Sequence, residues 1–490
     1  MLRTLMGAFA SILIFTSVSS AQVTNATLTG TVADTTGAAV PGAHFHVENS
    51  ATNASQDTVT NASGVYNVGR LLPGPYTVTV DANGFKRKIQ TEITLTVGQN
   101  ATVDIALEVG STNETVTVTG GAALVNTTNS EISQVIGENS VKELPLNGRN
   151  PANLVFLTPG ISNVMFSTAS KLQGGQSLPD ETGASAGGGR QGSTYYLLDG
   201  APNMNTYLLL AAPFPNSDAT QEFKVISNNF DARYGFAPNA VVSVQTKSGT
   251  NQIHGDLFEF IRNNNLNAAN YFSHAVDSLK RNQFGGDVGG PILKDKLFFF
   301  VNYQGTREST NAARNTTYTP TQAMLNGDFS AVPTTLKAPF ATVNGKPNQV
   351  NPALFNSAAV TIATTALPLG QTPATGLTNY AGPAQHDSYN EGTARIDYTI
   401  NDNQHLFVRS FTQYYNQKGG SVNGNILAWL QAIPGKYFNE AIGHTWAINA
   451  KTLNNITLDR RTCECGWHSQ RQLRRCLLLV ESHQCCRSSG

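Results

Sequence analysis

The chain has 490 residues, only 13% of them charged, and its 32 basic and 32 acidic residues cancel. This charged share is about half that of an average globular domain. A balanced, weakly charged chain offers no field for nucleic acid or anionic lipid, so we expect no nucleic-acid partner. The abundant Asn, Thr, Gly and Ala favour exported β-structure with many turns over a helical cytosolic enzyme.

Residues 1–21 predict a signal peptide. Arg3 supplies the positive start, Leu5–Val18 forms a short apolar core, and Ser19–Ala21 offers small residues for cleavage. This apolar run is too short to cross a membrane as a helix. We therefore expect an exported chain that is either soluble or a β-barrel.

Residues 22–110 predict a small β-sandwich. Apolar and polar residues alternate in segments such as Leu28–Val32, Ala43–Val47, Tyr76–Val80 and Val103–Leu107, and Gly- and Pro-rich turns separate them. This alternation is typical of half-buried antiparallel strands, and the stretch is long enough for about seven.

Several pieces of this sandwich carry a family resemblance. They are Gly30–Gly37, Val40–Ala43, Gly64–Tyr66, Leu72–Tyr76 and Gly84–Phe85. Together they resemble the carboxypeptidase regulatory-like domain, a transthyretin-like sandwich. The resemblance implies a module without catalytic activity.

Residues 111–120 predict a linker that contains one strand-like segment. An exposed strand of alternating Thr and Val can add to the edge of a partner's sheet. The segment resembles the TonB box, which implies capture by the periplasmic protein TonB. Two alternatives stay open: the last strand of the sandwich, or a plain linker. The residues of this candidate box are Glu114, Thr115, Val116, Thr117, Val118, Thr119 and Gly120.

Residues 121–250 alternate short strands with tight Gly turns. The order of Gly187–Gly200, Gln221–Ile226, Ala232–Ala237 and Val241–Gly249 resembles the plug domain of TonB-dependent outer-membrane receptors. The resemblance implies a small α+β domain that corks a transport barrel. Its signature residues here are Arg190, Asp199, Gly200, Tyr234 and Gly235.

Two charged positions of this region invite a role. Asp199 precedes Gly200, and we interpret it as a turn residue rather than a catalytic acid. Arg190 is a candidate contact to a barrel, and surface charge is the alternative. Upstream, Ser140–Leu144 suits a short helix, and Leu144–Arg149 with Pro159–Gly160 resembles the Oar-like subgroup of these receptors.

Residues 251–460 predict antiparallel barrel strands. Leu297–Gly305 alternates Phe299, Val301 and Tyr303 on one face with mixed polar and aromatic residues on the other, as barrel strands do. A hairpin over Thr393–Tyr414 shows the same alternation. Residues 311–385 predict a long extracellular loop, either functional or disordered.

The five cysteines all lie after residue 462, in a tail (461–490) that turns Arg- and Cys-rich and loses the strand alternation. We interpret this tail as aberrant, from a shifted reading frame, in preference to a zinc or disulfide segment. We expect no metal, no cofactor and no catalytic residue. His44 and His46 share one strand face, but two ligands alone do not make a zinc site.

The sequence therefore predicts a mainly β protein: an N-terminal transthyretin/Ig-like β-sandwich, a small α+β plug and an incomplete antiparallel outer-membrane β-barrel. Closure of the barrel would need well over about 400 residues, so we expect a receptor cut short. Its expected partners are TonB, outer-membrane lipid and an extracellular substrate that the sequence does not identify. The alternative is a secreted β-rich adhesion or carbohydrate-binding protein.

Overall fold

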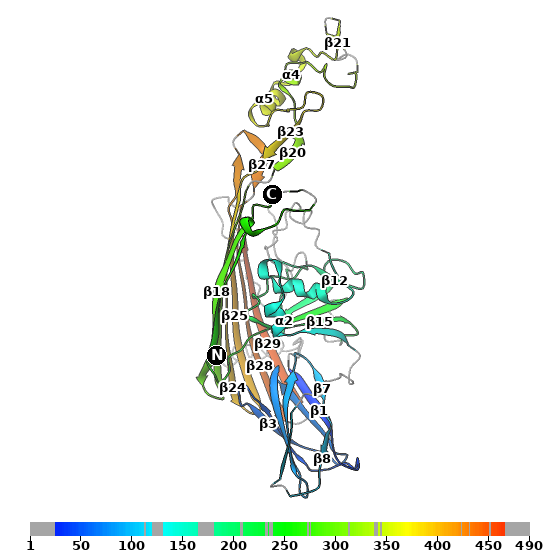
Figure 1. The fold of residues 1–490 in the computed structure, drawn as a ribbon, viewed down its shortest axis with the longest axis vertical. Helices are drawn as coiled ribbons and strands as arrows, with labels where there is room; N and C mark the ends of the chain where they lie inside the picture. Colours follow the sequence, from blue (N-terminus) through cyan, green and yellow to red (C-terminus); the bar gives the residue numbers. More distant parts are fainter. Residues whose placement is uncertain are drawn as a thin grey trace, which may run out of the picture.

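The computed structural model describes residues 25–111, 114–119, 131–164, 181–205, 209–230, 234, 239–271, 274, 276–311, 314–337, 342–343, 345–422, 424–430, 432–449 and 452–465. The predicted signal peptide and the tail beyond Cys465 lie outside these residues. Strands dominate, as the sequence predicts. The chain forms a β-sandwich, then a central mixed-sheet domain, then a seven-stranded wall, and a small lobe is inserted between two strands of the wall (Figure 1).

The N-terminal sandwich is built from nine strands. Their bounds are β1 (Ala26–Asp34), β2 (His44–Asn49), β3 (Ser55–Val59), β4 (Val65–Leu71), β5 (Gly74–Asp81), β6 (Arg87–Leu95), β7 (Asn100–Thr102), β8 (Ile105–Leu107) and β9 (Thr115–Thr119). One sheet joins β4, β1, β7 and β8, and the other has the order β3-β2-β5-β6-β9. The alternation predicted from sequence is confirmed, because Leu28, Phe45, Val78 and Ile105 are all buried in the shared core.

The central domain packs short helices on a five-stranded mixed sheet. Its elements are β10 (Ile132–Ile136), α2 (Glu138–Glu143), η1 (Asn147–Arg149), η2 (Pro151–Leu157), β11 (Ile161–Asn163), β12 (Ala184–Ala186), β13 (Thr194–Leu198), β14 (Ala201–Pro202), β15 (Thr220–Asn228) and β16 (Ala240–Thr246). The sheet order is β10-β15-β16-β13-β14, with only β13 and β16 parallel. The core of this domain includes Phe411 and Tyr437 from the wall.

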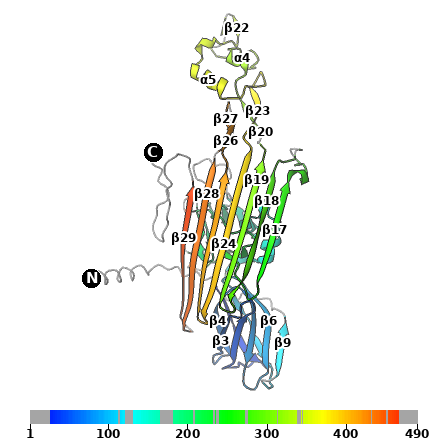
Figure 2. The same ribbon diagram turned by 90° about the vertical axis from the view of Figure 1, so that its left-hand side faces the viewer.

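The wall is a single antiparallel sheet of long strands. Their bounds are β17 (His254–Asn263), β18 (Lys280–Leu293), β19 (Leu297–Thr310), β24 (Gln385–Asn401), β25 (Gln404–Gln417), β28 (Ile433–Asn449) and β29 (Thr452–Cys465), with a short η4 (Asn264–Leu266) after β17. The sheet runs from β17 to β29 in that order (Figure 2). Among the described residues the outer edges of β17 and β29 have no strand partner.

The two faces of the wall differ as the sequence predicts. On β19, Phe300 and Asn302 are buried on the inner face, where the central domain packs, whereas Val301 and Tyr303 are exposed on the outer face. The predicted turn at 294–296 is confirmed by the pairing of Leu293 with Leu297. Strand β29 continues to Cys465, past the boundary predicted at 460, because burial still alternates through Thr462.

Residues 311–385, predicted to be a long loop that is either functional or disordered, contain short strands and helices. They hold β20 (Arg314–Tyr318), α4 (Gln322–Leu325), β21 (Thr342–Val343), β22 (Lys346–Pro347), η5 (Pro352–Leu354), α5 (Ser357–Thr365) and β23 (Leu377–Ala381). The hairpin of β26 (Gly420–Val422) and β27 (Asn425–Leu430) lies beside this lobe. The Asn- and Thr-rich sequence supplies helix caps, since Asn356 accepts from two backbone amides of α5 and Thr321 caps α4.

The lobe and the sandwich lie at opposite ends of the wall, and the central domain lies against its inner face (Figures 1 and 2). The sandwich contacts the wall through its turns. Asn53 donates to Asp295, the amide of Asn251 donates to the carbonyl of Ala51, and Asn25 donates to Thr445. No helix among the described residues is long and apolar enough to cross a membrane.

Candidate functional site: the contact between the central domain and the wall

A two-residue turn brings one carboxylate to the wall. Asp199 and Gly200 join β13 to β14 with φ angles of 50° and 79°. Two successive positive φ angles are those of a primed hairpin turn, for which Asp-Gly is among the favoured pairs. The sequence-based interpretation of Asp199 as a turn residue is therefore correct in geometry. Its side chain has a second role, because it is fully buried against the wall.

Asp199 binds two arginines from neighbouring wall strands. Its Oδ1 lies 2.9 Å from Nη1 of Arg395 on β24, and its Oδ2 lies 3.0 Å from Nε of Arg409 on β25. The same carboxylate accepts from the amide and hydroxyl of Thr246, at the end of β16. One side chain thus joins two strands of the central domain to two strands of the wall.

The arginines are satisfied by further wall groups. Arg395 makes a bidentate pair with Asp397, at 2.8 and 2.9 Å. Arg409 donates to the carbonyl and side chain of Asn439. Asp397 also accepts from Ser248 at 2.7 Å. Two acids and two arginines balance in charge, which is the condition under which buried ions are tolerated.

A second contact lies at Arg149, the last residue of η1. Its Nη2 lies 2.8 Å from Oδ2 of Asp218 in the central domain. Its guanidinium also lies over two wall rings on β17, at 4.7 Å from Phe258 and 3.9 Å from Phe260. Cation–π contacts of this kind gain strength when desolvated, and Arg149 is only 8% exposed.

The residues next to Arg149 also bind the wall. Asn147 accepts from Arg262 and Arg281, and the carbonyl of Gly148 accepts from Gln283 at 3.0 Å. Gly148 has a φ of 79°, which favours glycine, and an added Cβ would lie 3.2 Å from Arg281. The Leu-Asn-Gly-Arg motif seen in the sequence is thus a wall-binding turn.

A third contact uses neutral groups. The side-chain oxygen of Asn203 accepts from Tyr437 and from Asn439, each at 2.7 Å. The Nδ2 of Asn203 donates to the carbonyls of Ala212 and Pro213. Since Asn439 also binds Arg409, this contact is continuous with the ionic one.

The sandwich is joined to the central domain by two side chains of β15. The amide of Val97 donates to Glu222, and Lys224 donates to the carbonyl of Gly98 at 3.2 Å and to Glu131 at 3.1 Å. Burial raises the pKa of Glu222 to about 7, against the opposing effects of the Val97 amide and of Lys224.

The structure places the predicted site residues in different environments. Arg190 is exposed, and its backbone carbonyl accepts from the hydroxyl of Ser193. Tyr234 packs in a small cluster of the central domain with Leu197 and Val241. Gly235 and Gly120 lie outside the described residues.

The candidate TonB box lies at the free edge of the sandwich. Residues 115–119 form β9, which pairs in parallel with β6, as the alternative of a last sandwich strand predicts. Glu114 precedes the strand and forms an ion pair with Lys86 at 3.1 Å. Being the outermost strand, β9 still leaves one edge unpaired among the described residues.

Sequence reasoning missed Arg395, Arg409 and Arg149 as site residues. The available signal was their charge, since the chain has few charged residues. Arg395 and Arg409 lie on the inner face of wall strands, and Arg149 lies in a turn. The partner of each could not be read from the sequence, since 196 residues separate Arg395 from Asp199.

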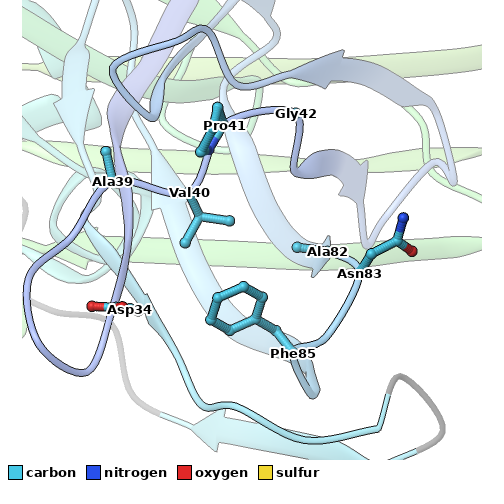
Figure 3. Close-up of a pocket in the computed structure, with 8 residues that line it drawn as sticks. All are labelled: Asp34, Ala39, Val40, Pro41, Gly42, Ala82, Asn83 and Phe85. Carbon is cyan, nitrogen blue, oxygen red and sulfur yellow. The ribbon is translucent and has the colours of Figure 1, made fainter.

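Two other features carry no site. The pocket in Figure 3, about 260 Å³, lies in the sandwich between Pro41 and Phe85, and Asp34 is its single ionisable lining residue. Asp34 is engaged by its own turn, through Thr36 and Ala38. His44 and His46 both face Asp57, and the described residues hold no cluster able to bind a metal.

Comparison with known proteins agrees with this architecture. Residues 245–470 match the outer membrane beta barrel domain family, and residues 27–108 match the carboxypeptidase regulatory-like domain family. The TonB-dependent transporter Oar of Myxococcus xanthus is 26% identical over 322 residues, which cover 60% of this chain and 29% of that protein. The chain thus spans less than a third of the length of this relative. A soluble secreted protein, the alternative raised by the sequence, is not favoured by the barrel match.

Two solved receptor structures are similar to parts of this chain. The siderophore receptor PirA from Acinetobacter baumannii is 15% identical, with a TM-score of 0.42, over 69% of this chain and 41% of its own. The ferric enterobactin receptor PfeA from Pseudomonas aeruginosa is 13% identical, with a TM-score of 0.41, over 68% of this chain and 41% of its own.

Proposed function

We propose that the chain is a TonB-dependent outer-membrane receptor, with a carboxypeptidase regulatory-like domain before its barrel domain, and that this architecture serves uptake of an extracellular compound across the outer membrane. The whole protein among these matches is named as a transporter. In this proposal the central domain (131–246) is the plug, and the wall (254–465) is barrel.

The observation that carries the proposal is the ionic contact at Asp199. A plug must be held firmly in its barrel and yet be movable, and a compact polar contact suits that need better than a continuous apolar interface. Asp199, Arg395 and Arg409 are fully or almost fully buried. Once water reaches them, each group can be hydrated separately, so that much of the cost of breaking the contact is recovered.

We assign the capture of TonB to β9 and its flanking residues, Glu114–Gly120. An edge strand offers unpaired backbone groups to an incoming strand, which is the usual basis of strand addition. Energy for plug movement would then come from a pull on this segment. The transported compound has no chemical signature in the described residues.

The test has two parts. Cells that express the chain are fractionated, and the outer membrane is expected to hold it. A purified TonB C-terminal fragment is then added to the chain in detergent, and binding is measured by biolayer interferometry. Recovery from the culture medium, or absence of binding by the intact chain, would count against the proposal.

A further inference from the structure

Two distant parts of the sandwich are connected through a single strand, β6. The first part of β6 pairs with β9, from Arg87 with Thr115 to Thr91 with Thr119. After Leu95 the same strand leads directly into the turn at residues 96–99. That turn is where Glu222 and Lys224 of β15 hold the sandwich.

We propose that the sandwich is a mechanical link, which carries load from β9 through β6 and the 96–99 turn into strand β15 of the plug. The proposal rests on the proposed capture of β9 by TonB only for the source of the load. The path itself depends on contacts within this chain.

At the β9 end of the link, backbone hydrogen bonds and ion pairs join the start of β9 to β6 and its neighbours. Before β9, the amide of Arg87 donates to the carbonyl of Glu114 at 2.9 Å, and Lys86 forms ion pairs with Glu114 and Glu108. The amide of Lys86 also donates to the carbonyl of Glu108. A pull along the strand axis loads the five residue pairs of this parallel ladder together, because they lie side by side along β6 and β9.

At the plug end of the link, two side chains of β15, Glu222 and Lys224, bind the 96–99 turn; we call this pair the grip. Glu222 accepts from the Val97 amide, and Lys224 donates to the Gly98 carbonyl, so that β15 binds both a backbone donor and a backbone acceptor of this turn. Glu222, Lys224 and Val97 are all buried. Because β15 lies between β10 and β16 in the plug sheet, the force acts on an inner strand of that sheet and not on its edge strand.

The covalent path is longer. It runs from β9 to β10 through residues 120–130, which can extend to roughly 40 Å at about 3.5 Å per residue. The sandwich path engages the plug without that extension. The proposal requires that load reach β15 before this covalent connection becomes taut.

A single-molecule pulling experiment tests this. The full chain, with its five cysteines replaced by serine and with Thr117→Cys as a handle on β9, is reconstituted in a bilayer and pulled from the periplasmic side. The parent chain is expected to give a force peak at short extension. Glu222→Ala with Lys224→Ala should lower that peak, because only the β9–β6 ladder and the contacts between the sandwich and the wall then resist the pull.

Controls keep the outcome clear. Gln221→Ala, at the half-buried residue next to Glu222 in β15, should retain the peak. If the double variant fails to fold, Lys224→Met alone replaces it. This variant keeps the buried aliphatic part of the side chain and should lower the peak. An unchanged peak in the grip variants would overturn the link. A second arm pulls with TonB C-terminal fragment on the probe: failure there, with the cysteine-handle result intact, would overturn TonB capture and leave the link standing.

Discussion

The carboxylate of Asp199 lies 3.0 Å from Nε of Arg409, although 210 residues separate them in the chain. Neither side chain has exposed surface. Each ion therefore depends on the other for compensation, and removal of one partner leaves a buried charge without its counterion.

Replacement of Asp199 by Asn is expected to loosen the central domain from the wall. The change keeps the side-chain shape but leaves Arg395 and Arg409 with one acid, Asp397, between them. Breaking a buried pair in this way costs about 3–5 kcal/mol. Limited proteolysis over a urea series should show cleavage of the central domain at lower urea than in the parent chain.

The matched control is Asp256→Asn. Asp256 pairs with Lys142 across the same two parts of the molecule, but both side chains are substantially exposed. Exposed pairs contribute about 0–1 kcal/mol, so the proteolysis midpoint should hardly move. Equal shifts for the two variants would contradict the role given to burial at Asp199.

Replacement of Arg149 by Lys should weaken the second wall contact despite conservation of charge. Lysine lacks the planar group that lies over Phe260 at 3.9 Å and also faces Asp218. We expect a loss of about 1–2 kcal/mol, the size of a desolvated cation–π contact. The measurement is the same urea series, with Arg262→Lys as an exposed control that should stay within about 0.5 kcal/mol of the parent.

How far the sequence predicts this molecule depends on the range of each interaction. The alternation on β19 and the turn at 294–296 are local, so periodicity and turn residues suffice for them. The faces of the β24 strand were also predictable, since Ile396 is exposed and Arg395 is buried as alternation requires. Strand order and partner choice across hundreds of residues have no local signature.

The site illustrates the limit. The Asp-Gly pair at 199–200 predicts a turn correctly, but the same carboxylate binds two wall strands, which only the tertiary structure brings near. Arg190 carries an equally visible charge and stays exposed. A charge in a turn is thus no guide to which turn meets the wall. The lobe was predicted only as a long loop, because its Asn- and Thr-rich composition is typical of loops, although caps such as Asn356 begin short helices there.

Proline substitutions in β9 separate its two edges. The Glu114 carbonyl faces β6, where it accepts from the Arg87 amide. Because peptide groups alternate along a strand, Val116 also faces β6, and Thr117 faces the free edge. Thr117→Pro removes a donor from the free edge and is expected to weaken binding of a TonB C-terminal fragment at least severalfold.

The companion variant is Val116→Pro, which removes a donor on the β6 side. It should increase amide hydrogen exchange in β6 while leaving the free edge able to accept a strand. Biolayer interferometry for binding and exchange mass spectrometry for β6 give two independent readouts. Unchanged binding by Thr117→Pro would remove β9 as the capture strand.

Docking of the sandwich on the central domain should depend on pH through Glu222. Its pKa is raised to about 7 in the docked state, because burial penalises the carboxylate. When the group is in water, its pKa has the ordinary value of 4.5. At pH below 4.5 both states are protonated and docking carries no penalty. As pH rises from 4.5 to about 7, the undocked state ionises first, so docking weakens by up to about 3 kcal/mol and then levels off.

The charges that face Glu222 are few and do not reverse this sign. Lys224 is two residues away and lowers the Glu222 pKa, but it is itself paired with Glu131. Hydrogen exchange at the Val97 amide, corrected for intrinsic rates, should therefore be slower at pH 5 than at pH 8. Glu222→Gln keeps an oxygen for the Val97 amide and cannot ionise, so its corrected exchange should be independent of pH. The same pH profile in both proteins would mean that another group controls docking.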